Sequence, residues 1–491
     1  MRATWEKILK GKIENNSGFS DFLVDDFGEL YECGLAHVDK NAKRDSGKYY
    51  TPNDVSSVMS RWLVDLPGES VADVGCGTGN LILAYLRELG KDKARSLIKA
   101  GKLHLFDLDE TALLICKYSI SIVYGVDLLE FINTYCSDFL SKDVVLPKDC
   151  KVISNPPYAK FSDILPNWEN TDVQRCTKEL YAAFFEKIIK SAKSAVIITP
   201  YSFCGSKKFF ALRKILNEHE GFIVSFDNVP ANIFCGRKHG IFNTNHANSV
   251  RASITVVKDD SARGFRLSPL LRFTSSERLK LLDNGVLEEF LGENYQLVDE
   301  KNDKYRKCFR CAEKVVSAWR SASTETIADL VQSEPNEFKI DIPNTCRYFC
   351  VASKRSLTRT GKYIVYAKNQ ACFDYLYAFI NSSFLYQQWR MFDGGITLTR
   401  ELLETTPTFF KALKAADFVV LRGKVEKACA KEEEHLVYKK NANVLQENVK
   451  FPVYIREDFN EFLVKRLGVD CSPDVFKAVH SNCVFGGVDD E

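Results

Sequence analysis

One short segment of the chain carries residue types that suit the chemistry of an amine. Asn155-Pro156-Pro157-Tyr158 directly follows an apolar run. Proline lacks an N–H, so two consecutive prolines stiffen the chain and leave carbonyl oxygens free as acceptors. Asn155 adds a side-chain acceptor and donor, and Tyr158 offers a ring face. Acceptors beside a stacking ring suit a planar amine, whereas Pro-Pro alone indicates only a stiffened turn.

A glycine-rich loop lies further towards the N-terminus. Asp73 is followed by Gly75, Gly77 and Gly79, one at every second position. Glycine is needed where the backbone turns tightly and approaches a ligand. The dinucleotide pattern G-x-G-x-x-G is absent. Asp73 suits a cationic amino group, and the helix start after the loop can receive a carboxylate. Asp107 ends the next apolar run and suits bidentate hydrogen bonding to ribose hydroxyls.

The elements that must position these residues alternate between strands and helices. Alternation of this kind predicts an α/β fold with a parallel, doubly wound sheet, whose carboxyl edge receives both motifs. Thr51-Pro52 has the form of a helix start, with Thr51 as N-cap and Pro52 at the first helical position. The strand candidates are 70–74, 102–107, 151–155, 194–199, 221–226 and 251–257.

Composition excludes several classes of protein. The 491 residues are 45% hydrophobic and 27% charged, with 67 Lys and Arg against 65 Asp and Glu. These values exclude wholesale disorder, collagen, coiled coil and a histone-like charge. The chain shows no apolar run of the roughly 18 residues that a membrane helix needs, and no secretion signal at its N-terminus. Sixteen scattered cysteines indicate a reduced, intracellular protein without a disulfide framework.

Taken together, these motifs resemble those of the S-adenosylmethionine-dependent N6-adenine DNA methyltransferases of the gamma arrangement. In that family the cofactor motifs precede the catalytic motif, and the target-recognition domain comes last. The matching segments, in the family's order, are Lys48-Tyr49-Tyr50-Thr51-Pro52, Asp73-Val74-Gly75-Cys76-Gly77-Thr78-Gly79, Phe106-Asp107, Ser137-Asp138-Phe139 and Asn155-Pro156-Pro157-Tyr158.

The resemblance implies a domain plan. We expect a Rossmann-like class I methyltransferase domain with a mostly parallel seven-stranded sheet at 46–260, after an N-terminal lead-in at 1–45. A C-terminal α+β target-recognition domain would span 261–420, followed by a helical segment at 421–491. The protein would be cytoplasmic and nucleoid-associated.

It also implies roles for individual residues. The cofactor S-adenosyl-L-methionine would be bound at its methionine end by Tyr50, Thr51, Asp73, Gly75 and Gly77. Asp107 would bind the ribose. Asp138 would accept a hydrogen bond from the adenine amine of the cofactor, and Phe139 would lie against that ring. A plain polar turn is the alternative for this last pair.

The catalytic expectation follows from the weakness of the adenine amine as a nucleophile. The Asn155 side-chain oxygen and the Pro156 carbonyl would accept from the amine and stabilise the positive charge that develops on nitrogen. No metal is needed. The base must leave the duplex, and Tyr158 would stack on one face of it. Phe234 is the candidate for the other face; Phe242 is an alternative, and so is a purely structural role for Phe234.

Basic residues gather in three acid-free stretches, at 187–217, 230–258 and 342–373. Such stretches suit the phosphates of double-stranded DNA, although a solvated basic face is the usual alternative for any one of them. The candidate DNA-binding residues are Arg237, Lys238, Lys354, Arg355 and Arg359.

Other functions remain open at this stage. The chain could methylate RNA, or it could be a non-catalytic DNA-binding subunit of a defence complex. A protein-glutamine methyltransferase is disfavoured by the large C-terminal region. Cys308, Cys311, Cys346 and Cys350 could hold zinc, but ordinary thiols are favoured. Only about 45 residues precede the Tyr-Tyr-Thr-Pro segment, so we expect methylation without cleavage, with any cognate restriction endonuclease on a separate chain.

Overall fold

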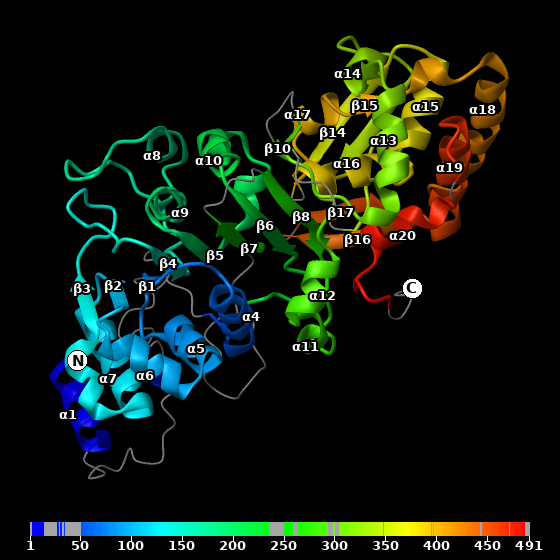
Figure 1. Cartoon of the computed structure of the whole chain (residues 1–491). Coiled ribbons are helices and arrows are strands. Elements are labelled where there is room, and N and C mark those ends of the chain that lie inside the picture. Colours follow the sequence, from blue (N-terminus) through cyan, green and yellow to red (C-terminus); the bar gives the residue numbers. More distant parts are fainter. Residues whose placement is uncertain are drawn as a thin grey trace. The chain divides into compact units, whose positions relative to one another are not determined.

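A computed structural model (Figure 1) describes residues 2–13, 27–28, 30–31, 34, 51–234, 250–258, 264–292, 298–299, 304–346, 348–393, 395, 397–441, 444–470 and 472–486. The chain divides into two compact units. Unit 1 runs to Arg306 and takes in Asn482 to Gly486, and unit 2 spans Lys307–Ser481. Among the described residues, no helix combines the length and the apolarity that crossing a membrane requires.

Unit 1 is built on an eight-stranded sheet with the order β3-β2-β1-β4-β5-β7-β6-β8. All neighbouring strands are parallel except β7, which runs antiparallel to β5 and β6. The predicted α/β fold with a mostly parallel sheet is therefore confirmed. The strands are β1 (Ser70–Val74), β2 (Leu103–Asp107), β3 (Asn133–Cys136), β4 (Cys150–Ser154), β5 (Ser194–Pro200), β6 (Glu220–Phe226), β7 (Ala252–Lys258) and β8 (Gly264–Leu271).

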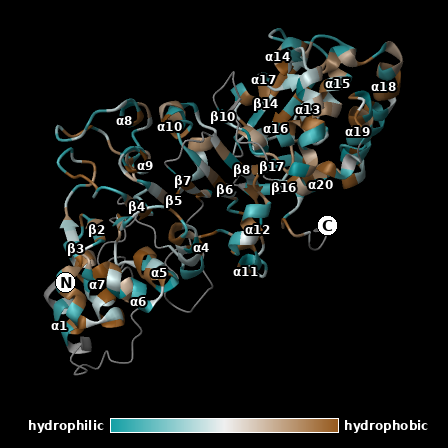
Figure 2. Cartoon of the chain, in the orientation of Figure 1, coloured by the Kyte–Doolittle hydropathy of each residue, from teal (hydrophilic) through white to brown (hydrophobic). Residues whose placement is uncertain are grey.

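Helices cover both faces of this sheet, and every residue of the central strands β1 and β4 is buried. Figure 2 shows the hydropathy of each residue along these elements. Val71 and Leu105 belong to one buried cluster with α4 (Asn53–Val64), α5 (Asn80–Leu89), α6 (Lys91–Lys99) and α7 (Glu110–Tyr124). Ala72 and Phe106, their neighbours in sequence, belong to the cluster with α8 (Asp172–Thr177), α9 (Leu180–Ser191) and α10 (Phe210–Leu216). Successive residues of a strand point to opposite faces, so a single apolar strand contributes side chains to both buried clusters. The helix α1 (Arg2–Ile13) packs on α7.

The sheet extends past the boundary expected at 260. β8 pairs in parallel with β6, so the sheet has one strand more than the expected seven. The chain then forms α11 (Arg278–Leu281) and α12 (Asn284–Glu289), followed by β9 (Val298–Asp299) and β10 (Lys304–Tyr305). Because α12 contacts α4, residues 264–292 belong to unit 1 and not to a separate domain.

Unit 2 is α+β. A three-stranded antiparallel sheet has the order β12-β14-β13, from β12 (Val331–Gln332), β13 (Lys339–Pro343) and β14 (Lys362–Ala367). The short pair β11 (Glu325–Thr326) and β15 (Pro407–Thr408) and the hairpin of β16 (Leu436–Asn441) with β17 (Val444–Val449) complete its strands. Its helices are α13 (Glu313–Ala322), α14 (Ile327–Leu330), α15 (Gln370–Asn381), α16 (Phe384–Phe392), α17 (Arg400–Glu404), α18 (Ala415–Ala430), α19 (Val453–Arg466) and α20 (Lys477–His480).

The segment after 420 is part of this unit and not an appended helical tail. Leu421 and Val425 of α18 and Phe459 and Phe462 of α19 lie in one buried cluster with the aromatic side chains of α15. The same segment also contains the β16–β17 hairpin. Leu421, Val425 and Ala428 thus form a buried apolar stripe on α18.

Candidate functional site

The glycine loop joins β1 to α5 at the carboxyl edge of the sheet. Gly75, Gly77 and Gly79 have φ values of +75°, +52° and +95°, a region that residues with a Cβ rarely adopt. A Cβ on Gly79 would lie 2.4 Å from the Cys116 sulfur, whereas one on Gly77 would meet nothing within 4 Å. Gly79 therefore allows the start of α5 to pack closely on Cys116 of α7. Gly77 faces open space where a ligand can approach.

Asp73 lies beneath this loop. Its side chain is fully buried, and among the described residues no side chain bonds to its carboxylate oxygens; the backbone N–H of Ile82 lies near enough to favour the charged form. Burial raises the pKa of Asp73 well above its ordinary value, and the nearby Asp107 carboxylate adds to the effect. A buried carboxylate that no described side chain neutralises fits the cationic amino group expected there, because an added positive charge would offset the cost of burying the carboxylate.

Asp107 ends β2 and joins the loop to the neighbouring turn. Its Oδ2 accepts from the Gly77 N–H at 2.8 Å, and its Oδ1 accepts from the Asp109 N–H at 2.8 Å. Asp109 has a different task. It caps α7 by accepting from the Thr111 and Ala112 N–H groups. Of the two acids, Asp107 is thus the one that lies beside the open face of the glycine loop.

Asp138 and Phe139 follow β3. The Oδ2 of Asp138 accepts from the Trp168 indole N–H at 2.6 Å, and its Oδ1 accepts from the Leu140 N–H at 3.0 Å. Phe139 is buried edge-on against Phe106, at 5.9 Å between ring centroids. No sequence pattern pointed to Trp168, which lies 30 residues beyond Asp138 in the chain.

Asn155 is held by a residue from a distant part of the chain. Its Nδ2 donates to Thr51 Oγ1 at 2.9 Å, and the Thr51 carbonyl accepts from the side chain of Asn80. The expected N-cap assignment was wrong by one residue, because Pro52 is the N-cap of α4 and no side chain caps that end. The Thr51 hydroxyl binds Asn155 instead. Tyr50 lies outside the described residues.

The end of β4 places Asn155 next to the glycine loop. Ser154 Oγ donates to the Val74 carbonyl at 2.6 Å, which ties the ends of the adjacent strands β4 and β1. A Cβ on Gly75 would lie 3.8 Å from the Asn155 carbonyl oxygen. Pro156 is buried, and Asn155 is half-buried. The two motifs found in the sequence are therefore side by side.

Tyr158 and Phe234 meet, but not as the two faces of a base-binding slot. Their ring centroids are 5.9 Å apart and the planes cross at 68°. A base stacked between two rings needs roughly parallel planes about 7 Å apart, since each stacking distance is about 3.5 Å. Phe234 is fully buried, whereas Tyr158 is half-buried. In this structure Phe234 is a core side chain that packs against the ring of Tyr158. Phe242 lies outside the described residues.

Several residues of the predicted basic stretches have structural partners. Arg213 is buried and donates to the carbonyls of Phe203 and Ser206. Lys208 pairs with Glu179, and Lys190 pairs with Glu186. The stretch at 187–217 is therefore less available to phosphate than its composition suggests. Arg237 and Lys238 lie outside the described residues.

In unit 2, Lys354 and Arg355 are exposed on a loop that a buried carboxylate holds in place. Glu432 accepts from the backbone N–H groups of Lys354 and Arg355, at 2.8 and 3.2 Å. The side chain of Arg355 lies 3.5 Å from exposed Glu433. Arg359 is half-buried and donates to the Gly361 carbonyl, and burial lowers its pKa. Lys354 and Arg355 are the more accessible candidates for phosphate contact.

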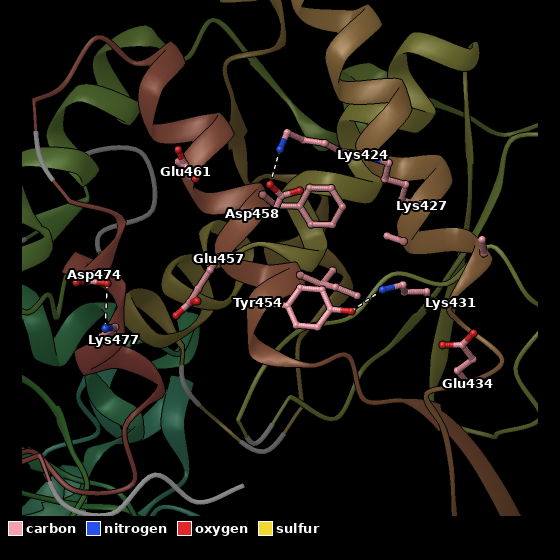
Figure 3. A pocket seen from close by; sticks show the side chains of 14 residues that line it. Lys424, Lys427, Lys431, Glu434, Tyr454, Glu457, Asp458, Glu461, Asp474 and Lys477 are labelled. Carbon is pink, nitrogen blue, oxygen red and sulfur yellow. Dashed lines mark hydrogen bonds and ion pairs between the residues drawn. The ribbon is translucent and has the colours of Figure 1, made fainter.

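Figure 3 shows a groove in unit 2, and none of the expected site residues is among the residues that line it. This groove, of about 940 Å³, lies between α18 and α19, and Lys424–Asp458 and Lys431–Tyr454 are bonded across it. Elsewhere in the described part of the chain, no three His, Cys, Asp or Glu side chains are grouped as metal ligands. Of the four cysteines considered for zinc, Cys311 hydrogen-bonds to the Val475 carbonyl.

Part of the chain is similar in sequence to known proteins. Residues 23–256 match the family model described as N-6 DNA Methylase. The chain resembles N6-adenine DNA methyltransferases. It is 21% identical over 369 residues to the Type I restriction enzyme MpnII methylase subunit of Mycoplasma pneumoniae, covering 66% of this chain and 60% of that one. It is 27% identical over 210 residues to the Type II methyltransferase M.PstI of Providencia stuartii, covering 40% of each chain.

The methyltransferase-like chain thus spans 60% or less of the length of these curated relatives. Among solved structures, it is similar to a nuclease-deletion mutant of the Type ISP restriction-modification enzyme LlaGI in complex with a DNA substrate mimic. That likeness covers 89% of this chain and 64% of the other, with 12% identity and a TM-score of 0.47.

Proposed function

We propose that the chain is a site-specific DNA adenine-N6 methyltransferase that uses S-adenosyl-L-methionine and acts on a base flipped out of the duplex. The observation that carries the proposal is the Asn155–Thr51 hydrogen bond beside the glycine loop. It fixes the amide nitrogen of Asn155 on Thr51, so the amide oxygen is the atom that can accept from a substrate amine.

The cofactor would be held by the residues around the loop. Asp73 would meet its amino group, and Asp107 would bind the ribose from beside Gly77. Asp138 would receive the adenine amine, and Phe139 would support the adenine pocket from the core. When bound, the cofactor supplies an electrophilic methyl group.

The chain's own residues would then act on the target amine. The Asn155 side-chain oxygen and the Pro156 carbonyl would accept hydrogen bonds from its two N–H groups. These bonds favour the pyramidal form of the amine and stabilise positive charge on nitrogen. Such acceptors act strongly because they are fixed before the reaction begins. The ring of Tyr158 would stack on the base, and Phe234 would hold the ring of Tyr158 edge-on from below. No protein group needs to form a covalent intermediate.

Double-stranded DNA would be the partner, with Lys354 and Arg355 as phosphate contacts in unit 2. A cognate restriction endonuclease would be a separate chain. The alternatives are an RNA adenine methyltransferase and a non-catalytic subunit of a defence complex. Neither is favoured by a specific contact in the described residues.

One experiment separates these functions. The purified protein is incubated with cofactor carrying a tritiated methyl group and with DNA, RNA or protein as acceptor, and the labelled nucleosides are then identified. Label in N6-methyladenine from DNA supports the proposal. Label in RNA or protein, or no transfer to any acceptor, contradicts it.

A further inference from the structure

The segment that follows the seven expected strands returns to the candidate site. After β8, helix α12 packs against α4, which begins two residues after Thr51, and α11 packs against α12. Asn284 Nδ2 donates to the Val58 carbonyl at 3.1 Å, and the Trp62 indole N–H donates to Glu288 at 3.0 Å. Residues 264–292 therefore form a brace on α4. No local sequence pattern indicates a contact between segments so far apart in the chain.

One residue of this brace reaches two parts of the site at once. Arg278, the first residue of α11, has only 4% of its surface exposed. Its Nε and Nη2 donate to the two carboxylate oxygens of Asp54, at 2.6 and 2.9 Å. Its Nη1 and Nη2 donate to the carbonyls of Asn232 and Ile233, at 3.1 and 2.7 Å. A rigid planar guanidinium can make such a fork and hold two carbonyls together, whereas a lysine ammonium cannot.

Each end of this contact lies next to a residue of the proposed site. Asp54 is in the first turn of α4, three positions after Thr51, whose hydroxyl holds the Asn155 amide. Asn232 and Ile233 directly precede Phe234, which supports the ring of Tyr158. The Asn232 side chain also accepts from the Phe234 N–H at 2.8 Å. The guanidinium thus joins the segment that orients the acceptor amide to the segment beneath the stacking ring.

We propose that Arg278 is a positioning residue for methyl transfer, which keeps the Thr51–Asn155 pair and the Tyr158–Phe234 pair in a fixed relation. This inference rests on the proposed function, because those pairs are assigned to the target amine and the target base. Without the fork, α4 and the 232–234 segment would shift independently. A displacement of about 1 Å in a catalytic geometry is enough to lower turnover by about a hundredfold.

The test compares two arginines of the same brace. Arg61 also joins α4 to residues after β8, since its guanidinium donates to Asn284 and to the Leu282 carbonyl, but among the described residues no hydrogen bond or ion pair joins it to the 232–234 segment. Arg278→Met and Arg61→Met each remove one such link. For both variants we would measure kcat and KM on duplex DNA, the Kd for S-adenosylhomocysteine and the thermal midpoint.

We expect both variants to lower the thermal midpoint. Arg278→Met should lower kcat on the order of a hundredfold, with the KM for DNA and the Kd for the cofactor product within about threefold of wild type. Arg61→Met should keep kcat within about twofold. Equal kcat losses in the two variants would overturn the inference, because the effect would then follow stability alone.

Milder variants keep the test decisive if Arg278→Met does not fold. Arg278→Lys keeps the positive charge but loses the paired hydrogen bonds to Asp54. Asp54→Asn removes the negative charge that the guanidinium binds while it preserves the shape of the side chain. Each should lower kcat by about tenfold with unchanged cofactor binding. Wild-type kcat in both would overturn the inference. Failure of the proposed function looks different, since the wild-type protein itself would then transfer no methyl group to DNA.

Discussion

The side-chain amide of Asn155 donates to the hydroxyl of Thr51 across 104 positions of sequence, with 2.9 Å between Nδ2 and Oγ1. This bond orients the amide nitrogen of Asn155 towards Thr51, which supports the proposal that the amide oxygen accepts from the substrate amine. It also explains why Thr51 does not cap α4, because its hydroxyl is already used. A residue that the resemblance assigned to the cofactor thus also orients the proposed catalytic acceptor.

The first prediction concerns that acceptor. Asn155→Ala should lower methyl transfer by about a hundredfold or more, because one fixed transition-state acceptor is worth on the order of 3 kcal/mol. Cofactor binding should stay nearly normal, since Asn155 is assigned to the amine. Single-turnover kinetics with labelled cofactor, together with calorimetric titration of S-adenosylhomocysteine, would measure both. Near-normal turnover would remove Asn155 from the mechanism.

Asp107 at the end of β2 and Asp109 just after it give a matched pair for the second prediction. Asp107→Ala should weaken S-adenosylhomocysteine binding by roughly 1.5–3 kcal/mol, because a charge-assisted contact to ribose is lost. Asp109→Ala should lower the free energy of unfolding by about 0.5–2 kcal/mol through the lost cap of α7, with little change in Kd. Calorimetry and urea unfolding distinguish the two effects. The opposite pattern would place the ribose at Asp109.

The third prediction separates two glycines of the loop. Gly77→Ala places a Cβ in open space, so it should weaken cofactor binding while costing only about 1–2 kcal/mol of backbone strain. Gly79→Ala should destabilise the fold more, because its Cβ would clash with the Cys116 sulfur. Adding Cys116→Ala should restore part of the stability lost in Gly79→Ala but none of the binding lost in Gly77→Ala. Urea unfolding and cofactor titration would show whether this division is correct.

The fourth prediction distinguishes the stacking ring from its support. Phe234→Ala should lower the free energy of unfolding by about 3–5 kcal/mol, as expected for a fully buried phenylalanine. Tyr158→Ala should cost less stability, because Tyr158 is half-buried, but it should reduce turnover on duplex DNA by about 1–3 kcal/mol of lost stacking. A fluorescent base analogue at the target position would report flipping. Unchanged flipping in Tyr158→Ala would count against its role.

The fifth prediction concerns DNA binding by unit 2. Replacing Lys354 and Arg355 together by Ala should weaken DNA binding uniformly across sequences and reduce the slope of log K against log salt by about 0.9 for each lost phosphate contact. Lys362→Ala serves as the control, because Lys362 is bonded to buried Asp341. It should lower stability and leave the salt slope unchanged. An equal slope for the double variant and the wild type would place the DNA contacts elsewhere.

Local sequence rules were sufficient for the parts of the site that lie on single elements. The glycine loop and the Asn155-Pro156-Pro157-Tyr158 segment each follow an apolar strand, and both therefore lie at one edge of a parallel sheet. Asp107 ends β2 for the same reason. These predictions depend on hydrophobic alternation, on the conformational freedom of glycine and on the missing N–H of proline, which act within a few residues.

Contacts between distant segments could not be predicted in this way. The sequence alone did not indicate that Trp168 would bind Asp138, that Phe234 would turn into the core, or that Arg278 would reach Asp54 from beyond the expected domain boundary. The same holds for charge, since a run of basic residues does not reveal that Arg213 is buried. Residue types and spacing determined which elements form and which edge of the sheet carries the chemistry. Only packing decided which side chains meet there, because those distances depend on how every element fits its neighbours.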